Sequence, residues 1–297
     1  MLVFLLLLSC FEEGVAQNSF ARGGLRARRA AGKISSAKEK GEQYQIAGLD
    51  VAVWQPSSYP AQGAPLVVFS HGFHGVNTQS ISLMKALASE GYLVVSPNHK
   101  DAMGSGRAFY KPEENLGNPA SWNDQTHVDR HKDVANLLKE LKSNPKWRGK
   151  IDWSKLVLAG HSLGGYTAMG CAGAWKTWTV PNVKAVLAIS PYCQPFAKHK
   201  TLAQLHPPLM YLSGTRDIGI LPFIKRPGGA FDQAGSPTYL VVFDKASHFA
   251  FTNFNRNSEQ NNLINHYCIA FLNKFVLGDA EAKPDVKLDG VTELDVK

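Results

Sequence analysis

Six short runs of consecutive apolar residues constrain the fold of this 297-residue chain more than any other feature. Parallel strands buried on both faces read as such runs, because neither face of the sheet is left for polar side chains. Residues 45–54 alternate more loosely and predict an antiparallel edge pair. The six runs cover residues 65–70, 92–96, 155–160, 185–190, 209–213 and 239–244.

Helical stretches separate several of these runs. Apolar residues recur at helical spacing in 80–89, 128–141 and 262–276, and residues 163–175 follow a predicted strand directly. Alternation of strands and helices over about 230 residues predicts one doubly wound α/β domain. We expect a mostly parallel central sheet flanked by helices, without a large cap domain.

The beginning of the chain resembles a targeting segment. Residues 1–16 open with MLVFLLLLSC and predict a signal or lipoprotein segment with Cys10 as the residue to be lipidated, although no basic stretch precedes it. A short buried N-terminal strand is the alternative. The apolar run Leu2–Leu8 is far shorter than the roughly 20 residues of a bilayer span. We therefore expect a secreted or cell-envelope protein that contacts a membrane only if Cys10 is lipidated.

The whole chain has a formal net charge of +8, and its charges are unevenly distributed after residue 16. Residues 17–42 are rich in Arg and Lys and lack a hydrophobic period, so they predict a disordered basic arm. No aromatic residues interleave with these charges, and we expect no nucleic-acid partner to be required. Residues 43–278 form the predicted domain, and residues 279–297 predict an acidic tail.

Ser162 lies in the strongest chemical motif, G-x-S-x-G, which spans Gly160 to Gly164. A predicted strand precedes the motif and a predicted helix follows it, as a nucleophile elbow requires. Only small residues fit two positions before and after the serine, because the turn is tight. We predict Ser162 as a nucleophile exposed above the sheet.

A serine hydroxyl needs a base, and the base needs an orienting acid. In this architecture the acid and then the base follow the serine in the chain. Asp217 comes after the run 209–213, and His248 comes after the run 239–244. Because ligands of open parallel sheets bind beyond the carboxyl ends of the strands, both side chains can converge on Ser162. We predict Asp217 as the acid in preference to its rivals, which are Asp244, Glu140 and Asp133.

Two backbone amides should form an oxyanion hole for the developing negative charge. Leu163, the residue after the nucleophile, supplies one. Phe73, in the loop that follows residues 65–70, supplies the other. The histidine pairs His71/His74 and His127/His131 have spacings that metal ligands also use, but no partner cluster or zinc-protease glutamate accompanies them, so we expect structural roles and no metal.

With these residues placed, the chain from about residue 43 to residue 276 resembles an α/β-hydrolase. Residues 68–106 resemble the dienelactone hydrolase-like group that includes the platelet-activating-factor acetylhydrolases, with His99-Lys100-Asp101 as its His-x-Asp turn. The segments around Asp217 and His248 resemble bacterial cutinases and polyester (PET) hydrolases, and plant chlorophyllases share a similar plan. The resemblance implies carboxylic-ester hydrolysis through an acyl-enzyme, without a cofactor.

The cutinase resemblance also implies an aromatic clamp on the acyl group, here Phe73 and Tyr192. Two departures matter. Dienelactone hydrolases proper carry a cysteine nucleophile, so Ser162 argues against that substrate. Polyester hydrolases usually have a cysteine pair near the C-terminus, whereas Cys268 would have to reach Cys171 or Cys193.

We therefore expect a monomeric serine carboxylic-ester hydrolase. Without a large cap its cleft is open, which suits bulky or polymeric esters, and the long connection 104–125 is expected to frame the site. A lipase or phospholipid acetylhydrolase and a chlorophyllase-like esterase are the alternatives. A non-catalytic hydrolase-fold binding protein is a more remote one.

Overall fold

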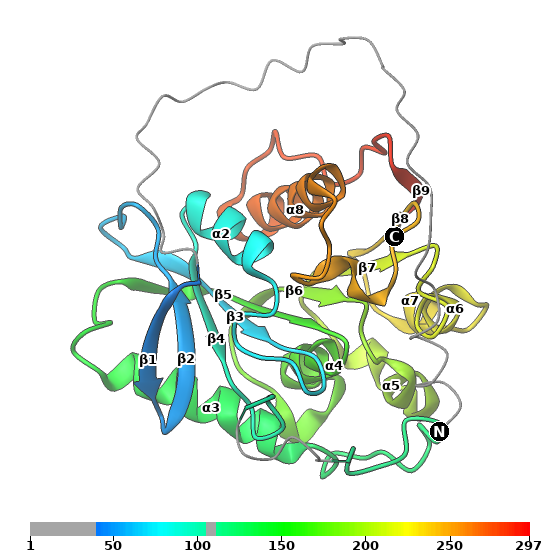
Figure 1. Cartoon of the computed structure of the whole chain (residues 1–297), viewed down its shortest axis with the longest axis horizontal. Helices are drawn as coiled ribbons and strands as arrows, with labels where there is room; N and C mark the ends of the chain where they lie inside the picture. The colour runs from blue at the N-terminus through cyan, green and yellow to red at the C-terminus, as the bar shows by residue number, and fades with distance from the viewer. Residues whose placement is uncertain (1–39, 105–110) are drawn as a thin grey trace. The chain divides into compact units, whose positions relative to one another are not determined.

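The computed structural model describes residues 40–104 and 111–297, which build one nine-stranded sheet (Figure 1). Its strands lie in the order β1-β2-β4-β3-β5-β6-β7-β8-β9. In chain order they are β1 (Glu42–Ile46), β2 (Leu49–Trp54), β3 (Ala64–Ser70), β4 (Leu93–Pro97), β5 (Ile151–His161), β6 (Val183–Ile189), β7 (Leu209–Gly214), β8 (Thr238–Phe243) and β9 (Val291–Val296).

The strands β3 to β8 pair in parallel, whereas β1, β2 and β9 run antiparallel to their neighbours. Each apolar run that predicted a buried strand lies in one of these parallel strands, and the predicted edge pair is the β1–β2 hairpin. The predicted fold class, a mostly parallel sheet flanked by helices, is confirmed.

Helices cover both faces of this sheet. They are α2 (Ile81–Ser89), α3 (Val128–Ser143), α4 (Leu163–Met169), α5 (Gln194–His199), α6 (Leu221–Lys225), α7 (Ala230–Gln233) and α8 (Ser258–Leu272). The helices α4 and α8 continue into π-helical turns over Gly170–Ala174 and Asn273–Leu277. Short 3-10 turns lie at Lys176–Trp178, Leu202–Gln204 and His248–Phe251.

The core consists of two apolar clusters, one on each face of the sheet. Successive side chains of a strand point to opposite faces. In β3, Leu66 and Val68 therefore join the cluster that packs against α3 and α4, while Val67 and Phe69 join the one beneath α2 and α8. Figure 1 shows α2 and α8 on one side of the sheet and α3, α4 and α5 on the other. Double coverage explains the continuous apolar runs in the parallel strands.

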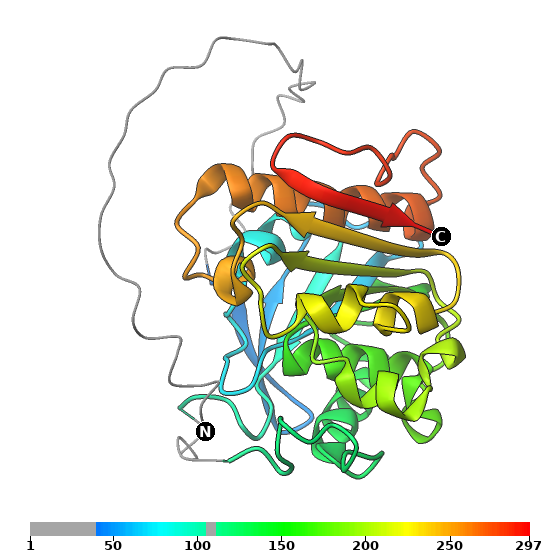
Figure 2. The same ribbon diagram turned by 90° about the vertical axis from the view of Figure 1, so that its right-hand side faces the viewer.

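The C-terminal segment corrects a prediction. Residues 279–297 were expected as an acidic tail, but β9 pairs antiparallel with β8 and forms an edge of the sheet (Figure 2). Within β9 the buried Val291 and the partly buried Leu294 face inward while acidic side chains intervene. The acidic composition hid an edge strand, because such a strand needs only one partly apolar face. The domain thus extends past residue 278.

Two predicted N-terminal segments are not covered. The predicted leader over residues 1–16, with Cys10, and the basic arm up to residue 39 lie outside the described residues. Within the described ranges, the helices are too short or too polar to cross a bilayer.

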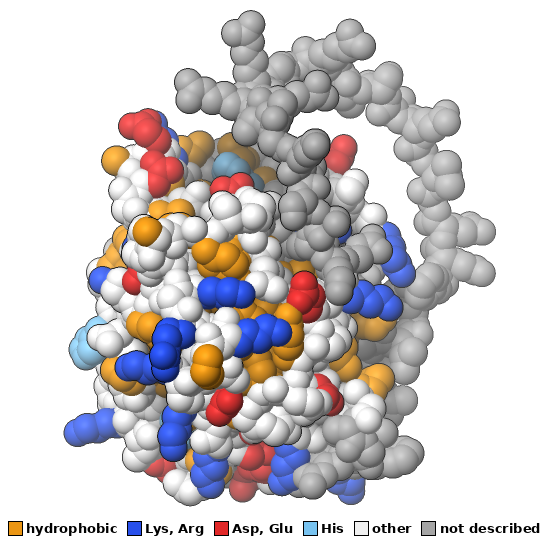
Figure 3. Space-filling model, turned by 90° about the vertical axis from the view of Figure 1, so that its left-hand side faces the viewer, with side chains coloured by type: hydrophobic (Ala, Val, Ile, Leu, Met, Phe, Trp, Pro, Cys, Tyr) orange, Lys and Arg blue, Asp and Glu red, His pale blue; other side chains and the backbone are white. Residues whose placement is uncertain are grey.

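Lysine side chains lie over aromatic rings near the β1 edge of the sheet. Lys146 Nζ is 3.8 Å from the centre of the Tyr44 ring, and Lys150 Nζ is 5.4 Å from that of Tyr59. Figure 3 shows Lys and Arg beside hydrophobic side chains on the side of the molecule where β1 lies. Charges at an edge strand discourage pairing with another chain, so we interpret these contacts as protection of the edge.

Candidate active site

Ser162 lies on the turn between β5 and α4. Its backbone has φ 56° and ψ −119°, a conformation that L-residues rarely adopt. The turn is held by hydrogen bonds from Ser162 N to Ile189 O (3.0 Å) and from Tyr192 N to Ser162 O (3.0 Å). A side chain on Gly160 would place its Cβ 2.2 Å from Gly164 O, so this position requires glycine. The local geometry is that of a nucleophile elbow.

Asp217 and His248 meet at the same end of the sheet. Asp217 follows β7, is 2% exposed, and lies with Oδ1 3.2 Å from His248 Nδ1. His248 follows β8, and its side chain is 22% exposed. Burial opposes a charge on Asp217, but hydrogen bonds from His248, Ser190 and Ser213 outweigh it and hold the pKa of Asp217 below its ordinary value. Asp217 is therefore an ionised partner for the imidazole.

The hydroxyl of Ser162 forms no hydrogen bond with His248 in the described part of the chain. Such contacts are often long in a hydrolase without substrate and tighten during the reaction. The structure thus brings the predicted acid and base into contact and places the predicted serine on its turn, and the three-residue catalytic assignment remains a prediction.

A polar chain connects the base to the loop after β3. His161 Nε2 lies 2.8 Å from His248 O, and since a carbonyl only accepts, this nitrogen carries the proton. His161 Nδ1 then accepts from Gln79 Nε2 at 3.0 Å, and Gln79 Oε1 accepts from Gly72 N at 3.0 Å. Burial, with the neighbouring His248, lowers the pKa of His161 to about 3, so its ring is neutral.

The two predicted oxyanion donors, the amides of Phe73 and Leu163, belong to the residues next to Gly72 and Ser162. Gly72 lies so close to the nucleophile that a Cβ on it would be 3.4 Å from Ser162 Cβ. The amides on either side of Phe73 are engaged, Gly72 N with Gln79 and His74 N with Asp101. Among the described residues the Phe73 amide has no hydrogen-bond partner. Leu163 opens α4, where an amide has no partner within the helix.

A buried ion pair contacts the loop of residues 71–74, which we call the oxyanion loop because it carries the predicted oxyanion donor Phe73. Arg130, on α3, is fully buried and binds both carboxylate oxygens of Asp101, at 3.1 and 2.7 Å. The same guanidinium donates to His71 O at 2.8 Å and to Gly72 O at 3.3 Å. Two loop carbonyls are therefore turned toward Arg130, and because the C=O and N–H of a trans peptide point in opposite directions, the Phe73 amide points away from Arg130.

The Arg130–Asp101 pair predicts how stability depends on pH. Burial raises the pKa of Asp101, but the Arg130 guanidinium outweighs it and holds that pKa well below the ordinary value of 3.8. A depressed carboxyl pKa stabilises the fold fully above the unfolded-state pKa, and this contribution is lost as the pH falls through the folded-state pKa.

We expect the free energy of unfolding of the wild type to decrease on acidification below about pH 4. In urea titrations the free energy of unfolding of the Asp101→Asn variant should decrease less on acidification than that of the wild type. Parallel pH profiles for the two proteins would contradict the assignment.

The two predicted clamp aromatics differ in exposure. Phe73 is partly buried and stacks on His74, with ring centres 4.0 Å apart. Tyr192 is 6% exposed, its hydroxyl donates to Leu116 O at 2.7 Å, and its ring lies 4.7 Å from that of Trp122. Tyr192 thereby anchors part of the long connection that was expected to frame the site.

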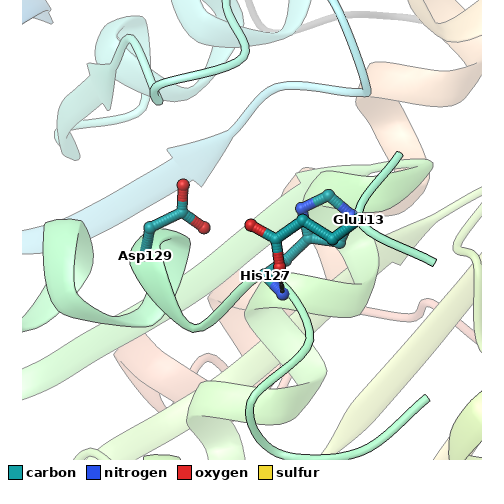
Figure 4. A group of neighbouring side chains, drawn as sticks. All are labelled: Glu113, His127 and Asp129. Atoms are coloured by element: carbon teal, nitrogen blue, oxygen red, sulfur yellow. Dashed lines mark hydrogen bonds between the residues drawn. The ribbon is translucent and has the colours of Figure 1, made fainter. Parts of the chain in front are cut away.

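One group of three described side chains could hold a metal ion: Glu113, His127 and Asp129, whose candidate ligand atoms lie within 4.8 Å of one another (Figure 4). Glu113 accepts a hydrogen bond from His127 N at 2.5 Å, and Asp129 accepts one from Arg130 N at 3.0 Å. Both carboxylates thus accept from amides at the start of α3, where the helix dipole favours negative charge, and the Arg130 amide is shared with His127 O at 3.0 Å. These capping contacts account for the grouping without a metal.

The three described cysteines are buried, and His131 packs against an aromatic ring. Cys171, Cys193 and Cys268 are all buried free thiols, so the pairing considered for Cys268 does not form. His131 stacks on Trp178, with ring centres 5.4 Å apart.

Four residues of this site were missed in the sequence: Gln79, Arg130, His161 and Ser190. Their roles arise from contacts between segments that lie far apart in the chain, and no local pattern marks Gln79, Arg130 or Ser190. Only His161 carried a signal, as the residue before the nucleophile in G-x-S-x-G.

The mostly parallel sheet, the elbow after β5, and the contact between Asp217 after β7 and His248 after β8 are those of the α/β-hydrolase class. Sequence comparison identifies the family within this class. The model of the Chlorophyllase family matches residues 51–217, which is more than half of the chain. The chain belongs to the chlorophyllase family.

The chain is also similar to platelet-activating factor acetylhydrolases. It is 26% identical to that of Gallus gallus over 170 residues, which cover 41% of this chain and 40% of the relative. It is 24% identical to that of Bos taurus over 172 residues, which cover 44% of this chain and 38% of the relative. The chain thus matches about two fifths of the length of these relatives. The predicted likeness to acetylhydrolases and chlorophyllases is confirmed, and the cutinase-like features remain a prediction.

Proposed function

We propose that the chain is a serine carboxylic-ester hydrolase that acts through an acyl-enzyme. The observation that carries the proposal is the hydrogen-bonded pair Asp217–His248 at the end of the sheet where Ser162 occupies its elbow. The family and the acetylhydrolase relatives support the same reaction class.

In the first half-reaction Ser162 Oγ attacks the ester carbonyl carbon while His248 Nε2 takes the hydroxyl proton. The carbonyl oxygen becomes an oxyanion that accepts hydrogen bonds from the amides of Phe73 and Leu163. The C–O bond of the alcohol then breaks, and the alcohol leaves with the proton from His248. In the second half-reaction water attacks the acyl-enzyme, His248 takes its proton, and the acid leaves as Ser162 recovers the proton.

The surroundings of the site favour apolar esters. Ile218 and Phe249 directly follow the acid and the base, and they are 80% and 42% exposed. Phe254 is 78% exposed, and its ring lies 5.9 Å from that of Phe249. Exposed apolar side chains at the mouth of a site suit an acyl or alkyl chain that must leave water.

Two substrate classes fit these features. Bulky or polymeric esters suit an open site. Esters of lipids are the second class, favoured by the acetylhydrolase relatives and by the family. A panel with p-nitrophenyl butyrate, a short-acyl phospholipid, chlorophyll and a polyester film ranks them by kcat/KM.

The test of the mechanism is covalent labelling with a fluorophosphonate, which reacts with activated serines. We expect one adduct per chain, located by mass spectrometry on Ser162, and loss of ester hydrolysis in proportion to labelling. Ser190 is the matched internal control, because it contacts the same Asp217 and His248 but is fully buried. An adduct on another serine, or hydrolysis that survives full labelling, would refute the proposal.

A further inference from the structure

Ser190 is a fully buried serine that the mechanism above does not use. It directly follows β6, the strand between those that carry the nucleophile and the acid. Its backbone has φ 43°, in the left-handed region, and its amide donates to Leu212 O at 2.6 Å. A non-glycine residue in such a conformation at a site is often there for its side chain.

The Ser190 hydroxyl touches both the acid and the base. Oγ lies 2.6 Å from His248 Nδ1 and forms a short hydrogen bond with Asp217 Oδ2. The direct distance from His248 Nδ1 to Asp217 Oδ1 is longer, at 3.2 Å. The nearest oxygen to the imidazole nitrogen is therefore that of Ser190.

The available protons decide the direction of these hydrogen bonds. The Asp217 carboxylate is ionised and only accepts, so the single proton of the Ser190 hydroxyl goes to Asp217 Oδ2. Ser190 Oγ can then only accept from His248, and Nδ1 must carry the ring proton. The neutral imidazole is thereby left with an unprotonated Nε2, which is the atom that a general base needs.

We propose that Ser190 is a positioning residue: its hydroxyl bridges Asp217 and His248 and selects the orientation and the tautomer in which the imidazole acts as the base. This inference rests on the proposed ester hydrolysis. Ser190 touches neither substrate nor the reacting atoms, so it acts through His248. Of the other side chains around His248, the ring of His161 lies 4.7 Å away and is neutral, and Phe249 is apolar.

Ser213 provides a matched control. Its Oγ donates to the same Asp217 Oδ2, at 3.0 Å, but it does not contact His248. Both serines are buried, and the Ser190→Ala and Ser213→Ala variants each remove one oxygen from the neighbourhood of the carboxylate. A purely structural or electrostatic role toward Asp217 affects both variants alike, whereas bridging to the imidazole affects only Ser190→Ala.

We expect Ser190→Ala to lower kcat for p-nitrophenyl butyrate about ten- to a hundredfold with KM changed less than about twofold, since the hydrogen bond to His248 Nδ1 that orients the imidazole is lost. Ser213→Ala should lower kcat less than about threefold, in line with an accessory contact. The low-field proton NMR signal of the His248 Nδ1–H should move in Ser190→Ala and stay in Ser213→Ala. Ser190→Gly, which also relieves the positive φ, should behave like Ser190→Ala and guards against a folding defect.

Equal effects of the two alanine variants on kcat, or an unchanged Nδ1–H signal in Ser190→Ala, would overturn the inference. A wild-type protein that neither hydrolyses esters nor takes up the fluorophosphonate would instead refute the proposed function. In that case the NMR comparison still decides whether Ser190 sets the tautomer, because it requires no turnover.

Discussion

Ser162→Ala is expected to lower kcat for p-nitrophenyl butyrate by about a millionfold, to the limit of detection. Without Oγ no acyl-enzyme can form, and water must attack the ester directly. The amides of Phe73 and Leu163, the proposed oxyanion donors, remain, so a residual rate about 10³–10⁴ above the uncatalysed reaction is expected. Initial rates at high enzyme concentration measure it.

The fold of the Ser162→Ala variant should be intact. Alanine adopts φ 56° with the same strain as serine, and the backbone hydrogen bonds of the turn do not involve Oγ. Ser89→Ala is a suitable control, because Ser89 is exposed and its Oγ only donates to Ala86 O. A Ser162→Ala protein that turns over as fast as this control would place the nucleophile elsewhere and end the proposal.

Arg130→Met is expected to have the largest effect on stability. It leaves the Asp101 carboxylate buried beside His71 and His99, and burial lowers the pKa of both imidazoles, so neither supplies a compensating positive charge. Breaking a buried pair from one side costs about 3–5 kcal/mol of unfolding free energy, because a charge remains without compensation. Urea denaturation followed by circular dichroism measures the loss.

A double variant distinguishes the cost of leaving the Asp101 carboxylate unpaired from the cost of losing the packing of the Arg130 side chain. Arg130→Met with Asp101→Asn removes both charges and should recover part of the stability lost in Arg130→Met. Arg148→Met is the matched control, because Arg148 is exposed and should change stability by less than about 0.5 kcal/mol. If Arg130→Met behaves like Arg148→Met, the ion pair does not stabilise the fold.

The Arg130→Met substitution should also lower the rate of ester hydrolysis. Arg130 binds the carbonyls of His71 and Gly72, so its loss frees the loop that presents the Phe73 amide. An oxyanion donor acts mainly on the transition state. In the folded fraction of Arg130→Met we therefore expect kcat to fall by a larger factor than KM rises.

The comparison of sequence and structure separates two kinds of information. The elbow around Ser162 was visible because its cause is local: a tight turn excludes side chains at Gly160 and Gly164, and the flanking strand and helix have their own periodicities. The parallel strands were visible for a similar reason, since burial on both faces leaves continuous apolar runs. In contrast, β9 was mistaken for a tail, because an antiparallel edge strand needs backbone pairing with β8 and little apolar sequence.

The sequence by itself determined the six parallel strands, the edge pair β1–β2, the helices α2, α3, α4 and α8, the nucleophile turn, and the candidates for acid and base, because short-range sterics and burial leave periodic traces in the chain. Only the tertiary structure decided that Ser190 bridges Asp217 and His248, and that Arg130 lies beneath the oxyanion loop. These contacts join loops at the ends of different strands. A hydrogen bond depends on distances of about 3 Å between atoms, and folding alone sets those distances for residues far apart in the chain.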